Sequence, residues 1–241
     1  MEMNFQTATV HTKDILCVHV TSDQYNKLQL LHEQLYEKKL QMICKRSFDI
    51  LVSSVLIFLL LPILILIIVL IKLTSRGPAV FSNERVGLHG RHFNCYKFRS
   101  MVINHTVKHD DHKQAIKGQN NGILYKAKTD NRITLIGKII RKTSIDELPQ
   151  LFNVLKGDMS IIGPRPLVPF MLKPFPEFSK VRCLVKPGIT GLWQIRDREH
   201  NTSAEFMIKH DTEYIENYGL MQDLKILIET PIAVLSAKGA Y

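Results

Sequence analysis

ILVSSVLIFLLLPILILIIVLI, residues 50–71, decides the class of protein to which this chain belongs. The stretch holds 22 residues without a charged side chain, which is long enough to cross the hydrocarbon core of a bilayer as a helix. It starts too far from the N-terminus and is too long to be the apolar part of a signal peptide. A soluble helix of this kind would need apolar neighbours on every side. The sequence therefore predicts a membrane helix.

Two features concern the path of this helix through the membrane. Pro62 lies near its middle, where the missing backbone donor predicts a kink. Basic residues flank both ends: Lys45, Arg46, Lys72 and Arg76. Because positive charge favours the cytoplasmic side, both ends are expected in the cytosol. A re-entrant helix that bends at Pro62 and returns meets both conditions, and an ordinary span with a proline kink stays open as the alternative.

The composition indicates anionic partners. The chain of 241 residues carries 32 Lys and Arg against 22 Asp and Glu, a formal net charge of +10. Such an excess favours nucleic acid, a phospholipid surface or phosphorylated small molecules as partners. The four cysteines are widely spaced, which predicts reduced thiols rather than a disulfide framework or a zinc site.

The chain is expected to divide into three parts around the membrane helix. Residues 1–43 form an N-terminal appendage, with a strand at 15–20 followed by an amphipathic helix. Residues 44–76 carry the membrane helix. Residues 77–241 form a small cytosolic α/β domain, so the fold class is α/β and mostly helical.

Within the C-terminal part the pattern predicts local elements. Residues 80–101 are strongly basic and form two strands joined by a glycine-containing loop. Residues 204–218 and 222–235 form helices, and the apolar stripe of the second faces either the core or a membrane surface. Residues 103–131 are expected to form a polar surface loop. The alternative, that three histidines within this stretch bind a metal, is less favoured.

The stretch TSIDELPQLFNVLKGDMSIIGPRPL, residues 143–167, carries the candidate chemistry. Asp146 and Glu147 stand just ahead of Pro149. A capping box starting at Ser144 would place the proline inside the helix, where its missing N–H breaks a bond. We therefore expect Asp146 at the N-terminus of the helix and Glu147 in its first turn.

This position suits chemistry on phosphate, because a helix N-terminus favours negative charge. An ionised aspartate there can attack phosphorus. Repulsion between carboxylate and phosphate then calls for arginines and for a divalent cation held by Asp146 and Glu147. Arg141 precedes the pair, and Arg165 stands between two prolines that restrict its backbone. From these residues alone, a capped structural helix stays the commoner alternative.

The same stretch resembles the hallmark of the bacterial sugar transferases, the monotopic phosphoglycosyl transferases. The resemblance covers residues 44–241, and its motifs are specific as a set. Besides this stretch and the proline-bearing membrane segment, the matches in chain order are Lys45-Arg46 with Asp49, Gly77-Pro78, Arg85, Gly87, Gly90, Tyr96-Lys97-Phe98-Arg99-Ser100-Met101, Arg132, Thr134, Gly137, Arg141, Lys186-Pro187-Gly188-Ile189-Thr190-Gly191 and Gly239-Ala240-Tyr241.

The resemblance implies transfer of a sugar 1-phosphate from a UDP-sugar to a membrane polyprenyl (undecaprenyl) phosphate, giving polyprenyl diphosphate sugar and UMP. This would be the first membrane step of glycoconjugate assembly, such as capsule, exopolysaccharide, O-antigen or glycoprotein. Asp146 would be the nucleophile that becomes a phosphosugar aspartate, and Glu147 would hold Mg²⁺ with it. A catalytically inactive membrane scaffold of the same fold is the alternative, against which the intact pair argues.

The resemblance also implies the binding residues and the setting. Arg141 and Arg165 match the phosphate-binding arginines, and Lys97 and Arg99 are assigned to substrate binding. The expected setting is the inner membrane of a bacterium, with the catalytic domain on the cytoplasmic face, interfacial amphipathic helices, a phospholipid surface as partner and no nucleic acid. A homo-oligomer is compatible with the sequence.

Three positions depart from the family pattern. Leu61 replaces the serine that many relatives place before the kink proline, so Pro62 alone must bend the helix. Asn83 replaces a glutamine. Residues 196–198 replace a glycine-containing turn where sugar or nucleotide preference is expected, so the sugar is left unnamed.

Overall fold

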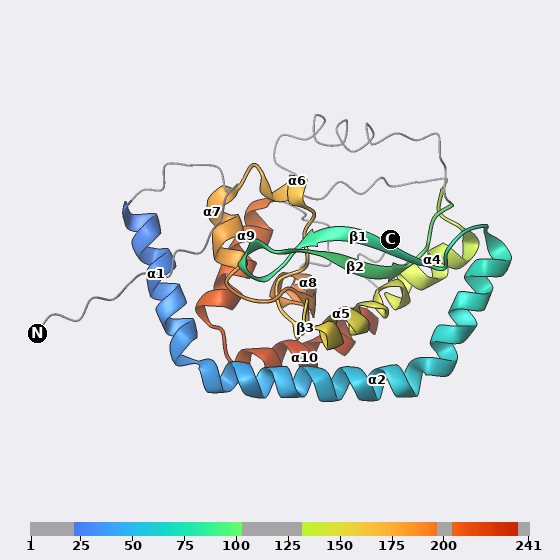
Figure 1. Ribbon diagram of the computed structural model, residues 1–241, viewed down its shortest axis with the longest axis horizontal. Coiled ribbons are helices and arrows are strands. Elements are labelled where there is room, and N and C mark those ends of the chain that lie inside the picture. The colour runs from blue at the N-terminus through green and yellow to red at the C-terminus, as the bar shows by residue number, and fades with distance from the viewer. Residues whose placement is uncertain (1–21, 103–131, 197–203, 236–241) are drawn as a thin grey trace, which may run out of the picture.

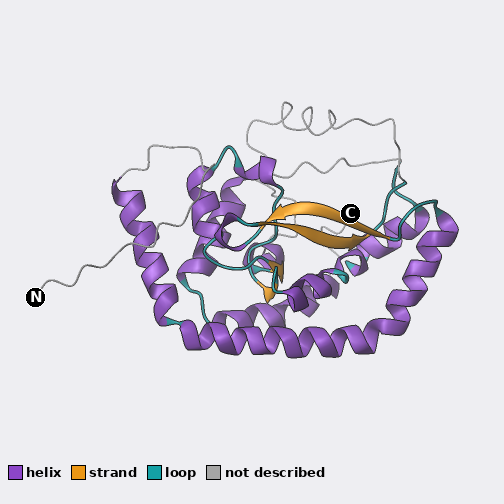
Figure 2. Cartoon of the chain, viewed as in Figure 1, coloured by secondary structure: helices purple, strands orange, loops and turns teal. Residues whose placement is uncertain are grey.

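The computed structural model describes residues 22–102, 132–196 and 204–235. One long helix runs along one edge of the described part of the chain (Figure 1). Helix α1 (Ser22–Glu37) leads into α2 (Lys39–Thr74). Two small sheets and the shorter helices lie on one side of α2 (Figure 2). They are, in chain order, β1 (Val80–Val86), a 3₁₀ turn (Leu88–Gly90), β2 (His92–Phe98), α4 (Leu135–Lys142), a second 3₁₀ turn (Ile145–Glu147), α5 (Gln150–Lys156), β3 (Ser160–Ile162), α6 (Pro169–Leu172), α7 (Pro176–Arg182), β4 (Gly188–Thr190), α8 (Leu192–Arg196), α9 (Ala204–Glu216) and α10 (Leu220–Leu235).

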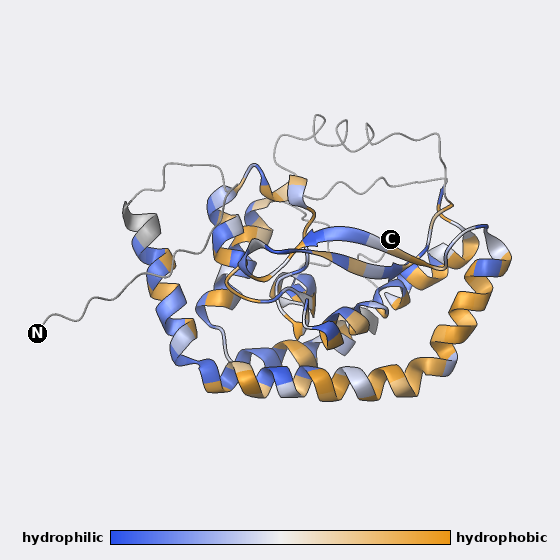
Figure 3. Cartoon of the chain, viewed as in Figure 1, coloured by the Kyte–Doolittle hydropathy of each residue, from blue (hydrophilic) through white to orange (hydrophobic). Residues whose placement is uncertain are grey.

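Helix α2 is apolar and bent. Among the described residues it is the one helix long and apolar enough to cross a membrane, so the predicted apolar helix is confirmed. Pro62 lies inside it, and the helix changes direction in its C-terminal third (Figure 1). In Figure 3 the ribbon of α2 carries hydrophobic colours almost without interruption from about its middle toward its C-terminal end. Its exposed large apolar side chains include Leu51, Val55, Phe58, Leu59, Leu61, Ile63, Ile65, Leu66, Ile68 and Val69.

Both ends of α2 pack on the same body. Its N-terminal half contacts α5 and β3. Near its C-terminal end Ile71 is buried in one cluster with Phe98 of β2 and Ile140 of α4. Arg99 then donates to the backbone carbonyl of Ser75, the residue that caps α2, at 2.8 Å. Residues that precede and follow the apolar segment are therefore held on one side of it.

Charged residues at the start of α2 anchor it to this body. Lys45 forms a buried ion pair of 2.6 Å with Asp223 of α10. The buried carboxylate of Asp49 accepts the backbone N–H of Ile161 at 3.0 Å. Arg46 donates to two carbonyl oxygens at the C-terminal end of α5, at 2.6 and 2.9 Å, where a positive charge is favoured by the helix dipole. Lys45 and Arg46, interpreted from the sequence as the basic flank of the membrane helix, therefore also hold the start of α2 against the rest of the protein.

Strands β1 and β2 form the predicted antiparallel hairpin, with Val80 opposite Phe98 and Val86 opposite His92. Side chains alternate between the two faces of a strand, and the register therefore places Arg85 and Lys97 on the same face. That face turns toward α5 and the second 3₁₀ turn, both of which contact β2. The hairpin thus directs the side chains of Arg85 and Lys97 toward the second 3₁₀ turn and α5.

Strands β3 and β4 form a parallel pair in the core. Ser160 lies opposite Gly188, and Ile162 opposite Thr190. A Cβ atom at Gly188 would lie 2.0 Å from the nitrogen of Gly163, so only glycine permits this approach. Buried side chains from several elements surround the pair, among them Val154, Met159, Tyr214 and Ile226. The segment after β3, residues 163–166, therefore leaves a rigid core.

Most sequence predictions of helix and strand agree with this architecture. Helices α9 and α10 match the helices predicted over 204–218 and 222–235, and the fold is mostly helical with small sheets. The strand predicted at 15–20 and the polar stretch 103–131 lie outside the described residues. Helix α1 of the predicted appendage contacts α7.

Candidate active site

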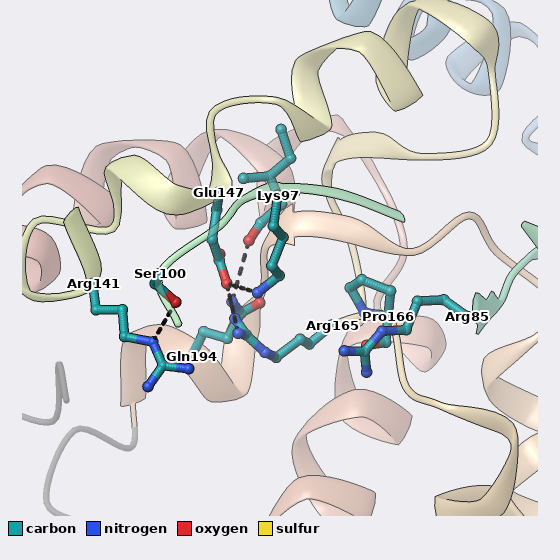
Figure 4. Close-up of polar contacts among 9 residues, drawn as sticks. Arg85, Lys97, Ser100, Arg141, Glu147, Arg165, Pro166 and Gln194 are labelled. Atoms are coloured by element: carbon teal, nitrogen blue, oxygen red, sulfur yellow. Dashed lines mark hydrogen bonds and ion pairs between the residues drawn. The ribbon is translucent and has the colours of Figure 1, made fainter. Parts of the chain in front are cut away.

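Glu147 lies at the centre of a cluster of cations (Figure 4). Lys97 contacts its Oε1 at 2.6 Å, and Arg165 contacts the same oxygen at 2.6 Å. A second Arg165 nitrogen lies 3.5 Å from Oε2. Burial alone would raise the pKa of Glu147, but Arg165 and Lys97 hold it well below its usual range. Glu147 is therefore an ionised carboxylate with both oxygens engaged.

Asp146 differs from Glu147 in the contacts of its carboxylate. Among the described residues its carboxylate makes no hydrogen bond or ion pair. Burial and the neighbouring charge of Glu147 raise its pKa, and Lys97, Arg165 and Arg141 counteract the rise. The pair therefore consists of one fixed carboxylate and one whose lone pairs are free, a division typical of groups with different roles.

A strained turn sets this arrangement. Ser144 adopts left-handed backbone angles, φ 57° and ψ 15°, which a residue other than glycine seldom takes and which cluster at functional sites. Asp146 and Glu147 follow in a 3₁₀ turn of their own, and α5 begins only at Gln150. The prediction that Asp146 starts this α-helix is therefore wrong by one turn. Pro149 causes the difference, because it takes the position just before the helix.

Arg165 reaches Glu147 from the segment that leaves β3. Its neighbours Pro164 and Pro166 are buried, whereas its side chain is 31% exposed. The charge of Glu147 raises the pKa of Arg165 against the effect of burial. A planar guanidinium held in this way presents its remaining N–H groups in a fixed orientation, which suits a phosphate.

Arg141 lies on the other side of the pair, at the end of α4. Its Nε donates to Ser100 Oγ at 2.9 Å, and another nitrogen contacts the sulfur of Met101 at 3.7 Å. A close approach makes this contact possible, because a Cβ atom at Gly137 would lie 2.0 Å from the Ser100 carbonyl oxygen. Arg141 makes no ion pair among the described residues, so its charge remains available to an anion.

The structure does not bring every predicted binding residue to Glu147. Arg99 instead donates to Ser75 at the end of α2, and two of its buried nitrogens find no hydrogen-bond partner among the residues that the structure describes. Conversely, Arg85 was placed by the sequence in a basic strand, with no role in binding assigned to it. Burial lowers its pKa, it lies close enough to Arg165 to repel it, and it donates to the Pro166 carbonyl at 3.3 Å. Strand alternation placing Arg85 on the Lys97 face was the available signal.

The site offers few side chains that could bind a magnesium ion. No group of three or more His, Cys, Asp or Glu side chains capable of holding a metal occurs in the described part of the chain. Asp146 offers free oxygens, and Glu147 offers oxygens already shared with two cations. Magnesium commonly binds through one or two carboxylates and completes its shell with substrate phosphates and water. The pair fits that mode.

Comparison with known proteins identifies a family that covers most of the chain. The model of the bacterial sugar transferase family matches residues 40–237. The undecaprenyl-phosphate galactose phosphotransferase of Salmonella typhimurium is 42% identical over 200 residues, 82% of this chain and 41% of that protein. The UDP-glucose:undecaprenyl-phosphate glucose-1-phosphate transferase of Klebsiella pneumoniae is 39% identical over 209 residues, 84% of this chain and 42% of that protein.

A shorter relative is matched over most of its length. The exopolysaccharide production protein ExoY of Sinorhizobium fredii is 36% identical over 206 residues, which cover 83% of this chain and 88% of ExoY. The chain thus spans less than half the length of the Salmonella and Klebsiella relatives. With the family match extending from α2 through α10, the chain belongs to the bacterial sugar transferase family.

Proposed function

We propose that this protein transfers a sugar 1-phosphate from a UDP-sugar to undecaprenyl phosphate in the bacterial inner membrane, releasing UMP. The observation that carries the proposal is the division within the acidic pair: Glu147 is fixed by Lys97 and Arg165, whereas Asp146 has no ion-pair partner in the described part of the chain. The names of the relatives support it, since they act on undecaprenyl phosphate with galactose or glucose. The sugar is left open because those names differ.

In the first proposed step, a carboxylate oxygen of Asp146 attacks the sugar-side phosphorus of the donor. The bond between this phosphorus and the bridging oxygen breaks, UMP leaves with the electron pair, and the sugar phosphate becomes esterified to Asp146. Arg165 and Arg85 lie on one side of the pair and Arg141 on the other, so cations flank the donor diphosphate and lower its repulsion with the carboxylate.

In the second step, an oxygen of the lipid phosphate attacks the same phosphorus and the carboxylate of Asp146 leaves. The products are the lipid diphosphate sugar and the regenerated enzyme. Magnesium would be held by Asp146 and Glu147 together with donor phosphate oxygens, and when bound it supplies charge neutralisation at phosphorus. Glu147 keeps Lys97 and Arg165 in place throughout, because it is ionised and contacts both.

The proposal includes a re-entrant path for α2, with both ends in the cytosol. The packing of both ends on one body supports it, because a straight span would separate its ends by about 30 Å of hydrocarbon. Helices α4 and α10 are proposed to lie in the membrane interface. Their outer faces are apolar and exposed: Leu135 and Ile139 on α4, and Leu224, Ile228 and Ile232 on α10.

We predict that single cysteines placed before and after α2 share one side of the membrane. In a background without native cysteines, Glu37→Cys and Glu84→Cys should resist a membrane-impermeant maleimide in intact cells and react with it after lysis. Phe58→Cys, in the exposed apolar part of α2, is the lipid-facing control. Labelling of the Glu37→Cys variant alone in intact cells would establish a span. Pro62→Leu should straighten α2 and produce that pattern.

Arg165→Lys is expected to reduce turnover about 10²-fold with folding intact. Lysine keeps the charge but loses the planar fork that contacts Glu147 and phosphate together. Initial rates of UMP release measure the effect, and Lys180→Arg, a solvent-accessible position paired with Glu177, is the control for exchanging these two residue types. Wild-type turnover in the lysine variant would remove Arg165 from the phosphate site.

The experiment that tests the function is a screen of UDP-sugars with purified protein, undecaprenyl phosphate and Mg²⁺ in detergent or nanodiscs. UMP release that depends on both the lipid and one UDP-sugar is expected. Formation of the lipid diphosphate sugar is followed by mass spectrometry. Absence of both products with every UDP-sugar would contradict the proposal and favour an inactive scaffold.

A further inference from the structure

The segment Pro164–Pro166 depends on outside groups for its position. Two of its three residues lack a backbone N–H, so the backbone of the segment is held mainly through its carbonyl oxygens. The first accepts from the backbone of Gly188 at 2.9 Å, and the third accepts from Arg85 at 3.3 Å. The middle carbonyl, that of Arg165 itself, accepts from Nη2 of Arg182 on α7 at 2.5 Å.

Arg182 is one half of a deeply buried ion pair. Its partner is Asp211 of α9, at 3.1 Å, and the two side chains are 5% and 1% exposed. Burial raises the pKa of Asp211 to about 6, against the opposing charge of Arg182. An ion pair buried to this extent stabilises a fold less than apolar side chains of the same volume would. Its presence therefore calls for a reason other than stability.

One nitrogen joins the two contacts. Nη2 of Arg182 lies 3.1 Å from Asp211 Oδ2, a charge contact without hydrogen-bond geometry among the described residues, and it donates to the Arg165 carbonyl. The negative charge of Asp211 therefore holds the guanidinium beside that carbonyl. The fixed carbonyl in turn fixes the backbone from which the Arg165 side chain reaches Glu147. A continuous chain of contacts thus runs from α9 to the acidic pair.

We propose that Arg182 and Asp211 are positioning residues for Arg165, acting through its backbone carbonyl. The inference rests on the proposed function, because Arg165 matters for turnover only if it grips phosphate. A small displacement of a group that grips the reacting phosphate can lower the rate of the chemical step by about 10²-fold. Loss of the pair should therefore lower kcat and leave the KM for the lipid acceptor nearly unchanged.

The first test is a double-mutant cycle on turnover. Arg182→Lys keeps the charge beside Asp211 but loses the planar fork, and Asp211→Asn keeps the shape but removes the charge. Each is expected to lower kcat by about tenfold to a hundredfold. In an Arg165→Lys background the same changes should cost less than about threefold, because residues acting through one another are not additive.

The second test reads the position of the segment without using activity. Hydrogen exchange is followed at Gly163, whose N–H bonds to the Thr190 carbonyl, and at Val86, whose N–H bonds to the Leu167 carbonyl. Gly163 precedes the segment directly, and Leu167, which accepts from Val86, follows it. Exchange at both should accelerate in the Asp211→Asn variant. The control is Ile215→Val, a buried apolar change on α9, which lowers the thermal midpoint without touching Arg182.

The outcomes separate the two proposals. Faster exchange and lower kcat in the Arg182 and Asp211 variants, with neither in the Ile215→Val control, support positioning. Unchanged exchange and kcat, or equal losses in the presence and absence of Arg165→Lys, would overturn it. If wild-type protein releases no UMP with any UDP-sugar, the proposed function fails, and faster exchange would still establish that the pair holds the segment.

Discussion

Replacing Asp146 by asparagine is expected to abolish both the covalent adduct and turnover, with a loss of at least about 10³-fold. An amide has nearly the shape of a carboxylate but is a poor nucleophile. The unpaired state of Asp146 means that no described ion pair is broken by the change. The substitution should therefore lower the reaction rate without unfolding the protein.

The assay uses the donor alone. Wild-type protein given a UDP-sugar without lipid should release UMP up to one equivalent per enzyme, and intact-protein mass spectrometry should detect the sugar phosphate on the chain. The Asp146→Asn variant should show neither. Normal turnover with both substrates but no adduct in wild-type protein would indicate direct transfer in a ternary complex, and the role assigned to Asp146 would be wrong.

The raised pKa of Asp146 adds a signature in pH. Its folded pKa lies above its ordinary value, so the folded state holds a proton at pH values where the unfolded chain does not. The ionised group therefore costs stability above that range, and the cost disappears as pH falls. Asp146→Asn should leave the thermal midpoint at neutral pH unchanged or slightly raised. In wild-type protein, adduct formation should decline as pH falls through the raised pKa.

The parts of the fold with a strong local pattern could be predicted from the sequence. The uncharged apolar run predicted α2, and strand alternation on both sides of a glycine-containing loop predicted the hairpin of β1 and β2. Apolar residues at helical spacing predicted α9 and α10. Each signal lies within one element, and burial of its apolar face determines its conformation. The acidic pair could also be singled out, because Pro149 conflicts with a simple capped helix.

The partners of the pair could not be predicted from local pattern. Lys97 and Arg165 meet Glu147 from 50 and 18 residues away, and only the hairpin register and the β3–β4 pairing bring them together. The contacts of Arg85 and Lys45 could not be predicted for the same reason. In the sequence Arg85 belongs to a basic strand and Lys45 to a basic flank, whereas in the structure Arg85 is buried beside Arg165 and Lys45 is paired with Asp223.

Glu147→Gln should produce a different combination of losses from Asp146→Asn. Glutamine keeps the length of the side chain but leaves Lys97 and Arg165 facing each other without a carboxylate between them. Removing one partner from a buried ionic cluster costs about 3 kcal/mol, so the thermal midpoint should fall. The depressed pKa of Glu147 means that the stability it supplies in wild-type protein is fully present above its ordinary pKa and is lost progressively as pH falls from there toward the folded value.

The activity of the Glu147→Gln variant should fail mainly at the lipid step. Asp146 remains able to attack, so the adduct should form slowly with donor alone, while transfer to the lipid phosphate should fall below detection because cations and magnesium are no longer held in place. Glu84→Gln, an exposed carboxylate beside His92, is the matched control and should change neither stability nor rate. A Glu147→Gln variant with wild-type stability and wild-type lipid transfer would show that the positions of Lys97 and Arg165 do not depend on this carboxylate. The separate roles assigned to Asp146 and Glu147 would then be wrong.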